Sequence, residues 1–524
     1  TSGRTSNEAA FLYQLFVREY GTNNLPDCSN MCHEPSGVAM TEQIGSGKGS
    51  VLLEDFEHAE AIFIFGQNPG TNHPRMLGEL RNASKRGCRI VAFNPLRERG
   101  LERFTSPQSP KEMLTGGSTS IASHYYQPKI GGDLAAVKGI AKAVVEADAL
   151  DRDFIAQHTS GFDAFAGDLR ATSWDAIERE SGLTRTQIED AARVYRESNA
   201  TIFCWGMGIT QHRRSVATIQ MLLNLLLLRG NIGKPGAGPC PVRGHSNVQG
   251  DRTMGIYEQP SAAFLDKLGK AFDFAPPRAF GYDTIAAIEA MEDRRAKVFF
   301  AMGGNFAVAT PDSTRTQQAL RNCALTVHVA TKLNRSHLVH GAAALILPCL
   351  GRTEIDVQEA GPQSVTVEDS MSMVHLSAGM NPPASEHLLS EPAIVARLAA
   401  ATLPQSKTPW LWLIADYDRI RERIAEVIDG FADFNKRVRE RGGFHLRHPA
   451  RERVFSTDDG KAGFYPHVLN DAVDAAAGKP TLQLTTLRSH DQYNTTIYGL
   501  DDRYRGVRGY RRVCFISRGD LDKL

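Results

Sequence analysis

The sequence predicts a multidomain α/β protein with two doubly wound domains, because one pattern of buried strand, polar glycine-containing turn and helix occurs twice. The first instance begins at the apolar run 61–65 and the second at 297–301. Apolar runs of this length suit parallel strands that are buried on both faces. Ligands bind at the carboxyl ends of such strands, so each domain is expected to hold one ligand there.

The first predicted domain, residues 1–240, carries the clearest strand and helix patterns. Its expected elements are a helix at 8–20, strands at 61–65, 89–93 and 201–205, and helices at 74–85 and 215–228. The step from the first strand to the second is about 28 residues, the size of a parallel crossover connection.

The second predicted domain covers residues 241–402, with further strands at 325–330 and 344–347. A charged, helical or linker region, 403–478, follows it. From Thr481 the sequence becomes rich in Thr, Gln, His, Asn and Tyr, which is typical of β structure. Residues 479–524 are therefore predicted to begin a β-rich C-terminal domain that continues beyond this chain.

Composition favours a large soluble globular protein. Of the 524 residues, 42% are hydrophobic and 23% charged, and the formal net charge of +1 suggests neither nucleic acid nor a membrane surface as partner. The longest apolar run, 221–228, is too short to span a bilayer, and no signal peptide is visible. The eight cysteines are scattered, unlike a secreted disulfide scaffold. We predict a cytoplasmic protein without a transmembrane segment.

The segment Asp27-Cys28-Ser29-Asn30-Met31-Cys32-His33 is the first candidate for chemistry. A deprotonated thiol is a soft ligand for a transition metal, and an adjacent histidine lowers a thiol pKa or accepts a proton near neutral pH. Cys28 and Cys32 also have the spacing of a two-cysteine metal or redox site. Two small buried cysteines beside a loop histidine would give the same pattern. The residues alone leave these three interpretations open.

The long loop 230–250, rich in glycine and proline, contains the second candidate, Arg243. Its planar guanidinium suits a carboxylate or a phosphate. A surface arginine is the alternative, although loops this long in compact α/β proteins are usually functional or disordered.

Two turns that follow predicted strands, 66–70 and 302–305, are candidates for binding a diphosphate through backbone amides. Neither matches a dinucleotide-binding or P-loop motif, so each is equally well a plain strand-to-helix turn. Asn94 ends the second strand, where groups that contact a ribose usually lie.

Together these segments resemble the large catalytic subunit of the molybdopterin oxidoreductases, most closely the formate-dehydrogenase-like branch. The resemblance runs along most of the chain, in the family's order. Its strongest parts are Thr22-Asn23-Asn24, Cys32-His33-Glu34-Pro35-Ser36, Asn68-Pro69 with His73-Pro74, Arg243-Gly244-His245-Ser246-Asn247-Val248-Gln249-Gly250 and Arg488-Ser489-His490-Asp491-Gln492-Tyr493-Asn494-Thr495.

The resemblance implies a role for each matched residue. In that family a cysteine or selenocysteine at the position of Cys32 ligates molybdenum, and the residues that match His33 and Arg243 lie over the metal. These three are therefore the expected catalytic residues, and Cys32 is the expected metal ligand. The family binds two pterin guanine dinucleotides. The residues expected to line one dinucleotide are Asn68, His73 and Asn94. Those expected on the second or around the pterins are Gly206, Gly303, Asn305, Thr331 and Lys332, with His490 and Asn494 in a C-terminal pterin-binding segment.

Three positions depart from the formate dehydrogenases. Glu34 stands where those enzymes usually have glycine, and His245 where they often have glutamine, both near the expected substrate. Asn94-Pro95-Leu96 replaces the commoner Asp-Pro-Arg. The family's N-terminal iron–sulfur domain would precede Thr1, so a 4Fe–4S cluster is expected only in a longer protein.

The predicted function is two-electron oxidation of a small anionic substrate, formate first, with Arg243 holding the carboxylate and an acceptor protein or subunit taking the electrons. Oxygen-atom transfer, as in nitrate reductases of the same superfamily, is a second hypothesis. The Cys32-His33 pair argues against it, because a proton acceptor serves formate oxidation more than nitrate reduction. A cofactor-binding stress protein with little turnover is a third.

Overall fold

The computed structural model describes residues 1–469 and 482–522, and the chain divides into two compact units. Unit 1 comprises Thr1–Thr41, Ser46–Leu52 and Cys240–Val454, and unit 2 comprises Glu42–Gly45, Leu53–Pro239 and Phe455–Leu524. Each unit is thus assembled from separate stretches of the chain. The predicted domain boundary between residues 478 and 479 lies outside the described residues.

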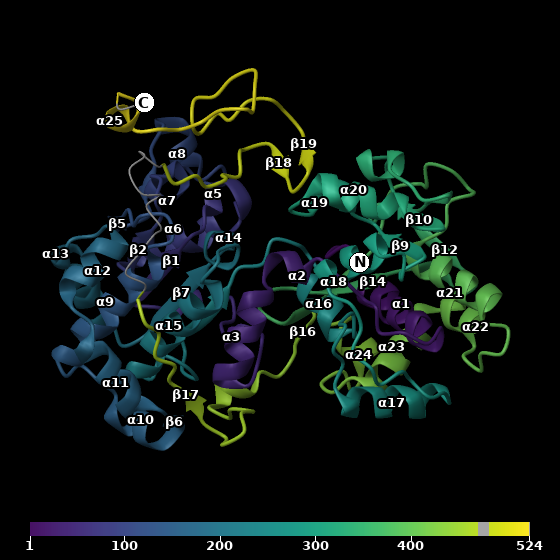
Figure 1. The fold of residues 1–524 in the computed structure, drawn as a ribbon, viewed down its shortest axis with the longest axis horizontal. Coiled ribbons are helices and arrows are strands. Elements are labelled where there is room, and N and C mark those ends of the chain that lie inside the picture. Colours follow the sequence, from purple (N-terminus) through teal and green to yellow (C-terminus); the bar gives the residue numbers. More distant parts are fainter. Residues whose placement is uncertain (470–481, 523–524) are drawn as a thin grey trace. The chain divides into compact units, whose positions relative to one another are not determined.

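Unit 2 is built on a sheet with the strand order β5-β2-β1-β7-β8 (Figure 1). The strands are β1 (Ala61–Phe65), β2 (Arg89–Phe93), β5 (His124–Tyr126), β7 (Thr201–Trp205) and β8 (Gly238–Pro241). The pairs β1–β2, β1–β7 and β2–β5 are parallel. Every residue of β1 and β7 is buried, as their continuous apolar sequences predict.

Helices surround this sheet and complete the crossover connections. The helix α6 (Met76–Arg86) links β1 to β2 and ends at Gly87, whose φ of +95° suits glycine. The helix α9 (Asp133–Glu146) packs against α12 (Trp174–Ser181), α13 (Arg185–Arg196) and α15 (Ser215–Leu228). The other elements of unit 2 are α4 (Asp55–His58), α5 (Pro69–Asn72), α7 (Arg99–Glu102), β3 (Arg103–Phe104), α8 (Pro110–Thr115), β4 (Thr119–Ser120), α10 (Arg152–His158), β6 (Thr159–Ser160), α11 (Phe162–Ala171), α14 (Met207–Thr210), β17 (Ala462–Gly463), β18 (Gln492–Tyr493), β19 (Thr496–Ile497) and α25 (Arg518–Leu521).

Unit 1 contains the second parallel sheet, in the order β11-β10-β9. Its strands are β9 (Val298–Met302), β10 (Leu325–Ala330) and β11 (Ala343–Pro348). The helix α18 (Thr284–Glu292) packs against α20 (Ser313–Arg321) beside the sheet.

In the core of unit 1, the first helix of the chain packs against helices that lie about 400 residues later in the sequence. The helix α1 (Asn7–Glu19) buries Phe11, Leu12 and Leu15 and packs against α21 (Glu391–Thr402) and α23 (Tyr417–Val427). Glu8 on α1 forms a buried ion pair with Arg421 on α23, at 2.9 Å. The other elements of unit 1 are α2 (Ser29–Cys32), α3 (Glu34–Ile44, which passes into unit 2), α16 (Val248–Thr253), α17 (Ala262–Phe272), α19 (Phe306–Ala309), η1 (Arg335–Leu338), β12 (Asp356–Gln358), β13 (Gly361–Gln363), β14 (Val365–Glu368), β15 (Met373–Ser377), α22 (Trp410–Ala415), α24 (Phe434–Arg437), β16 (Phe444–His445) and η2 (Pro449–Glu452).

The two parallel sheets with their helices confirm the predicted α/β class. Some segments differ from the expectation. The loop 230–250 contains the strand β8 and the first residues of α16. Within the predicted helical or linker region 403–478, the helices α22, α23 and α24 are followed by β16, which joins an antiparallel sheet, and by the 3-10 helix η2. In the described part of the chain after Thr481, β18 and β19 form a short hairpin.

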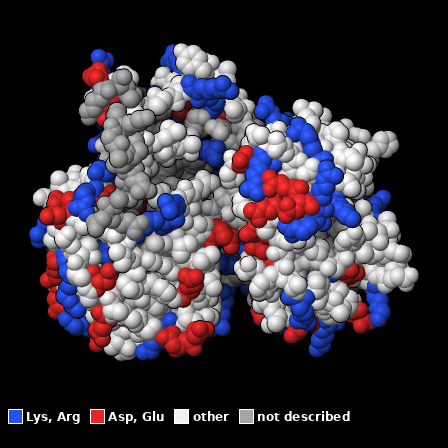
Figure 2. All heavy atoms as spheres, in the orientation of Figure 1, with Lys and Arg blue, Asp and Glu red and all other residues white. Residues whose placement is uncertain are grey.

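The face seen in Figure 2 carries both acidic and basic side chains, in line with the formal net charge of +1. Among the described residues, no helix is both long enough and apolar enough to cross a membrane.

Candidate functional site

Cys32 and His33 lie at the end of the short helix α2 in unit 1. The carboxylate of Asp27 accepts hydrogen bonds from the amides of Ser29, at 3.0 Å, and Asn30, at 3.3 Å, which fixes the turn that starts this helix. Cys32 is 8% exposed and His33 only 1%. Nδ1 of His33 lies 3.1 Å from the hydroxyl of Ser36, which orients the imidazole ring. A thiol and an imidazole are thus held next to each other in a buried turn.

Cys28 lies at the other end of the same turn. Burial raises the pKa of its thiol well above the ordinary value, and the carboxylates of Asp27 and Asp251 act in the same direction. A thiol that keeps its proton is a weak ligand and a weak nucleophile. Gly3 packs so closely on Cys28 that a Cβ there would lie 2.5 Å from the sulfur. All eight cysteines are outside disulfides, so Cys28 and Cys32 are not bonded to each other.

Arg243 belongs to the same unit and follows β8. Its backbone amide donates to the hydroxyl of Ser370, at 3.2 Å, and its Nη2 donates to the carbonyl of Gly47, at 2.8 Å. Asn247, four residues further on, anchors the loop: its amide nitrogen donates to the carbonyl of Thr5 at 2.6 Å, and its side-chain oxygen accepts from the amide of Glu368 at 2.7 Å. The loop from Arg243 to Asn247 is therefore anchored at both of its ends by hydrogen bonds to other parts of unit 1.

The charge of Arg243 interacts with groups of the first candidate segment. Burial lowers the pKa of its guanidinium, and the negative charges of Cys32, as a thiolate, and of Glu368 oppose that change. The charges of Cys32 and Arg243 thus act on each other within unit 1, and His33 directly follows Cys32 in the chain. A guanidinium suits a small anion, and a cysteine thiol, once deprotonated, suits a soft metal.

The glutamate that departs from the family pattern forms a structural ion pair. Glu34 pairs with Arg252, which also pairs with Asp27 at 3.1 Å and lies over the ring of Tyr257 at 4.4 Å. The carboxylate of Glu34 is thereby engaged by the protein. This arrangement argues against Glu34 as a substrate-binding group.

The second departure, His245, lies close to the cysteine turn. Gly3 stands between them, since its Cβ would lie 2.5 Å from the Cys28 sulfur and 2.9 Å from Cβ of His245. Burial lowers the pKa of His245 to about 4, and Arg4 adds to the effect. His245 is therefore a neutral imidazole at neutral pH.

The residues expected on one dinucleotide lie in unit 2, after β1 and β2, and Gly206, expected on the second dinucleotide or around the pterins, follows β7 of the same sheet. Asn68 and His73 flank α5, and His73 contacts Gln67 at 3.3 Å. The side chain of Asn94 donates to the carbonyl of Gln67 at 3.4 Å. A Cβ at Gly206 would lie 3.2 Å from the Gln67 side chain. Asn68, His73, Asn94 and Gly206 therefore gather at one sheet edge, where doubly wound proteins bind ligands.

This edge also receives the segment that follows residue 481. Arg505 pairs with Glu98 at 2.6 Å, and Asn68 hydrogen-bonds to the same Glu98. The amide of His490 donates to Asp502, at 3.3 Å, and Asn494 occupies the hairpin turn with a φ of +51°. His490 and Asn494 thus lie on a segment that Arg505 ties to the first sheet.

The corresponding turn of unit 1 follows β9 and contains Gly303 and Gly304. Both have positive φ, +69° and +81°, and a Cβ at Gly304 would meet nothing within 4 Å. Asn305 accepts from the hydroxyl of Ser336 at 2.9 Å, which fixes the turn onto η1. Thr331 and Lys332, which follow β10, are exposed. The open backbone beside Gly304 allows close approach of a ligand.

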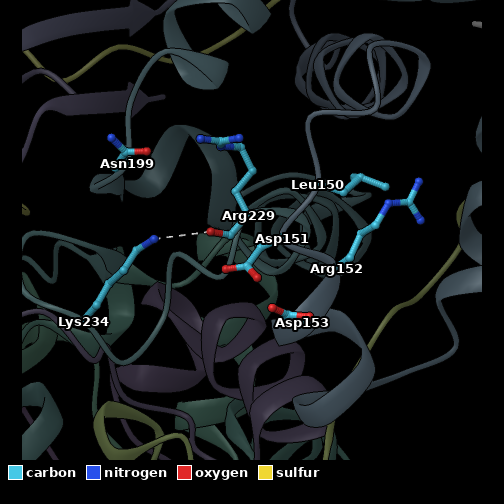
Figure 3. A pocket seen from close by; sticks show the side chains of 7 residues that line it. All are labelled: Leu150, Asp151, Arg152, Asp153, Asn199, Arg229 and Lys234. Carbon is cyan, nitrogen blue, oxygen red and sulfur yellow. Dashed lines mark hydrogen bonds between the residues drawn. The ribbon is translucent and has the colours of Figure 1, made fainter.

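A surface pocket of unit 2 offers less. It has a volume of about 400 Å³, and Arg229, Lys234 and Asp151 are among its lining residues (Figure 3). Arg229 donates to the backbone carbonyls of Ala149 and Ser198, both at 3.2 Å, and Lys234 donates to the carbonyl of Arg229 at 3.3 Å. Both cations hydrogen-bond to backbone carbonyls of the surrounding segments, so the pocket offers no argument for a ligand site.

A chain with two parallel α/β sheets, a buried Cys-His pair and a loop arginine can now be set beside known proteins. The chain belongs to this family, whose model, "Molybdopterin oxidoreductase", matches residues 1–356. Protein YdeP of Escherichia coli K12 is 55% identical over 529 residues, which cover 99% of this chain and 69% of that protein. Formate dehydrogenase H of the same strain is 31% identical over 290 residues, 55% of this chain and 38% of that enzyme.

A solved structure shares the fold. Acetylene hydratase from Pelobacter acetylenicus matches with a TM-score of 0.66 and 16% identity, over 88% of this chain and 62% of that chain. This chain therefore spans less than two thirds of that protein's length. The likeness concerns the fold alone.

Membership of the family implies molybdenum and a pterin cofactor, and the residues present fit both. Cys32 offers a buried thiol, the donor type that a soft metal prefers. In unit 2, Oδ1 of Asn68 is buried without a hydrogen-bond partner among the described residues, so it suits a polar ligand group. In unit 1, the open space at Gly304 leaves room for one.

Proposed function

We propose that the chain is the catalytic part of an enzyme that oxidises formate, or a similarly small anion, at a molybdenum held by two pterin guanine dinucleotides. The observation that carries the proposal is the buried guanidinium of Arg243, which lies in the electrostatic field of Cys32. The relation to formate dehydrogenase H supports formate as the first candidate substrate.

Each of three side chains has one role in this proposal. Oxidation of formate yields carbon dioxide, one proton and two electrons, and the bound cofactor supplies the centre that accepts the electrons. Cys32 holds the metal through its sulfur. Arg243 binds the carboxylate and orients it through its planar guanidinium, which the Gly47 carbonyl helps to hold in place. His33 accepts the proton, with its ring oriented by Ser36.

The residues proposed to bind the cofactor lie mostly after the carboxyl ends of strands in the two parallel sheets. Asn68, His73 and Asn94 would hold one guanine dinucleotide, and the five residues Gly206, Gly303, Asn305, Thr331 and Lys332 would contact the second dinucleotide or the pterins. His490 and Asn494 would contribute from the C-terminal segment. Their places after parallel strands support these assignments.

For the whole protein the proposal adds a 4Fe–4S cluster, an electron-acceptor protein or subunit, and a cytoplasmic location. The first two are what the resemblance to the formate-dehydrogenase-like branch implies. Eight cysteines without a disulfide support a reducing compartment.

The test uses the full-length protein loaded with molybdenum. We expect formate to reduce an artificial one-electron acceptor such as benzyl viologen, in proportion to the molybdenum content. Nitrate-dependent oxidation of the reduced dye, without formate activity, would instead support oxygen-atom transfer. A protein replete with molybdenum that acts on neither formate nor related small carboxylates would reject the proposal.

A further inference from the structure

A partly buried ion pair in unit 1 involves the residue that follows Gly47 in the chain. The ammonium of Lys48 contacts the carboxylate of Glu368 at 2.6 Å, and the Glu368 side chain is wholly shielded from solvent. Gln249 donates to the same carboxylate at 2.7 Å, and the hydroxyl of Thr253 donates to it at 2.5 Å. Lys48 also donates to that hydroxyl, at 2.8 Å. Of these partners of Glu368, only Lys48 carries a positive charge.

Lys48 directly follows Gly47, whose carbonyl accepts the hydrogen bond from Arg243. Nη2 of Arg243 donates to the carbonyl of Gly47, and the carbonyl of Lys48 lies 2.8 Å from Nε2 of His448. His448 also contacts the hydroxyl of Ser46 at 3.2 Å. The segment 46–48 is therefore fixed by His448 on its backbone and by Glu368 through its lysine. This segment presents the Gly47 carbonyl to Arg243.

Glu368 also attracts Arg243 directly. Its negative charge favours the charged form of that guanidinium. A buried carboxylate without a cation is costly, so it takes the nearest cation that can reach it. In the structure Lys48 forms the ion pair with Glu368, and Arg243 donates its hydrogen bond to the carbonyl of Gly47. Without Lys48, Arg243 would be the natural substitute.

We propose that Lys48 is a positioning residue: by neutralising Glu368 it keeps the guanidinium of Arg243 on the Gly47 carbonyl, turned toward the bound anion. The inference rests on the proposed function in one respect, that Arg243 is the group that binds the anion. A merely structural Lys48 would affect stability and leave Arg243 in its place.

The experiment uses the full-length, cofactor-loaded protein and four variants. Lys48→Met removes the charge, Glu368→Gln removes its partner, and the double variant removes both. Lys138→Met is the matched control, because Lys138 forms a buried ion pair with Asp168 at 2.8 Å in unit 2. Lys48→Gln, which keeps a hydrogen-bond donor, replaces Lys48→Met if the latter does not fold.

Two measurements are made on each protein. Crystal structures locate the guanidinium of Arg243, and isothermal titration calorimetry gives the Kd for formate. In Lys48→Met we expect Arg243 to hydrogen-bond to Glu368 and the Kd to rise by about tenfold or more, with unchanged molybdenum content. The double variant should return Arg243 to Gly47 and the Kd to within about threefold of wild type. Lys138→Met should change neither.

Two results would overturn the inference. One is that Arg243 still donates to Gly47 in Lys48→Met with an unaltered Kd. The other is that the double variant binds formate as weakly as Lys48→Met does. A failure of the proposed function looks different, because Arg243→Gln would then bind formate as well as wild type. The crystallographic position of Arg243 in Lys48→Met would still decide the role of Lys48.

Discussion

The guanidinium of Arg243 donates from Nη2 to the carbonyl oxygen of Gly47, at 2.8 Å. One arm of the planar fork is therefore held by the protein. Lysine has no such plane, and its single ammonium would bind either the carbonyl or an anion with little control of direction.

The first prediction concerns this geometry. Arg243→Lys should raise KM for formate by about tenfold or more, with a smaller fall in kcat, because a bidentate contact to the carboxylate is lost. Steady-state kinetics beside molybdenum analysis measures both effects. Arg278→Lys, at an exposed arginine of the same unit, is the control. A metal-poor Arg243→Lys protein would show that Arg243 serves the cofactor.

The second prediction separates the two cysteines of the α2 turn. Cys32→Ala should lose molybdenum and all turnover, since a methyl group cannot replace a thiolate ligand. Cys28→Ala should keep the metal, because the resemblance assigns the metal to Cys32 and burial raises the pKa of the Cys28 thiol. Its cost should be a modest loss of stability, about 1 kcal/mol. Equal loss of metal in both variants would favour a shared two-cysteine site.

The third prediction assigns the proton to His33. His33→Ala should lower kcat by roughly 10²–10⁴-fold with little change in KM, if the imidazole is the general base. Ser36→Ala removes only the partner of Nδ1 and should lower kcat by much less. Rates and metal content are measured on the same preparations. An unchanged kcat in His33→Ala would remove this residue from the proton transfer.

The fourth prediction concerns Glu34 and its ion pair with Arg252. Glu34→Gln should leave kcat/KM for formate within about threefold of wild type, because the carboxylate is engaged by the protein. The pair is partly exposed, so the free energy of unfolding should fall by about 1 kcal/mol or less. Kinetics with formate and other small carboxylates, beside urea unfolding, test both. A change of substrate preference would return Glu34 to the substrate site.

The fifth prediction is a pH dependence of stability from His328 on β10. This side chain is 4% exposed, and burial lowers its pKa from 6.5 to about 4. Between these two values the unfolded chain binds a proton that the folded protein does not. The free energy of unfolding therefore falls as pH drops from 6.5 to 4, by up to about 3 kcal/mol from this residue.

Urea unfolding at several pH values between 7.5 and 4.5 tests the effect of His328. His328→Gln does not titrate and should lose less stability on acidification than wild type. His387→Gln, at a histidine whose side chain is 88% exposed, should behave like wild type. Identical pH dependence in His328→Gln and wild type would contradict the prediction.

The buried strands were predictable because their sequences are short, apolar and bounded by turn residues. The predicted strand 201–205 and helix 215–228 coincide with β7 and α15. Helix α13 was missed although its start carries a signal, since Thr184 and Gln187 form a capping box. Its charged, exposed face hides the apolar stripe when the sequence is scanned for hydrophobic runs.

The candidate site was predictable only in part. Cys32, His33 and Arg243 follow from motifs that the family shares. Lys48 and Glu368 carry no such signal, because they are 320 residues apart and meet only in the folded unit. The ion pair of Glu34 likewise depends on Arg252, 218 residues further along the chain. Contacts of this kind follow from tertiary packing, which local sequence patterns do not encode.

The buried pair of Glu8 and Arg421 has a consequence for biosynthesis, since 413 residues separate its members. At a synthesis rate of roughly 5–20 residues per second, Arg421 is made about 20 to 80 s after Glu8. During that interval α1 lacks its contacts with α21 and α23, which are made last among its helical neighbours. We therefore expect the nascent segment to depend on a chaperone until these helices have been made.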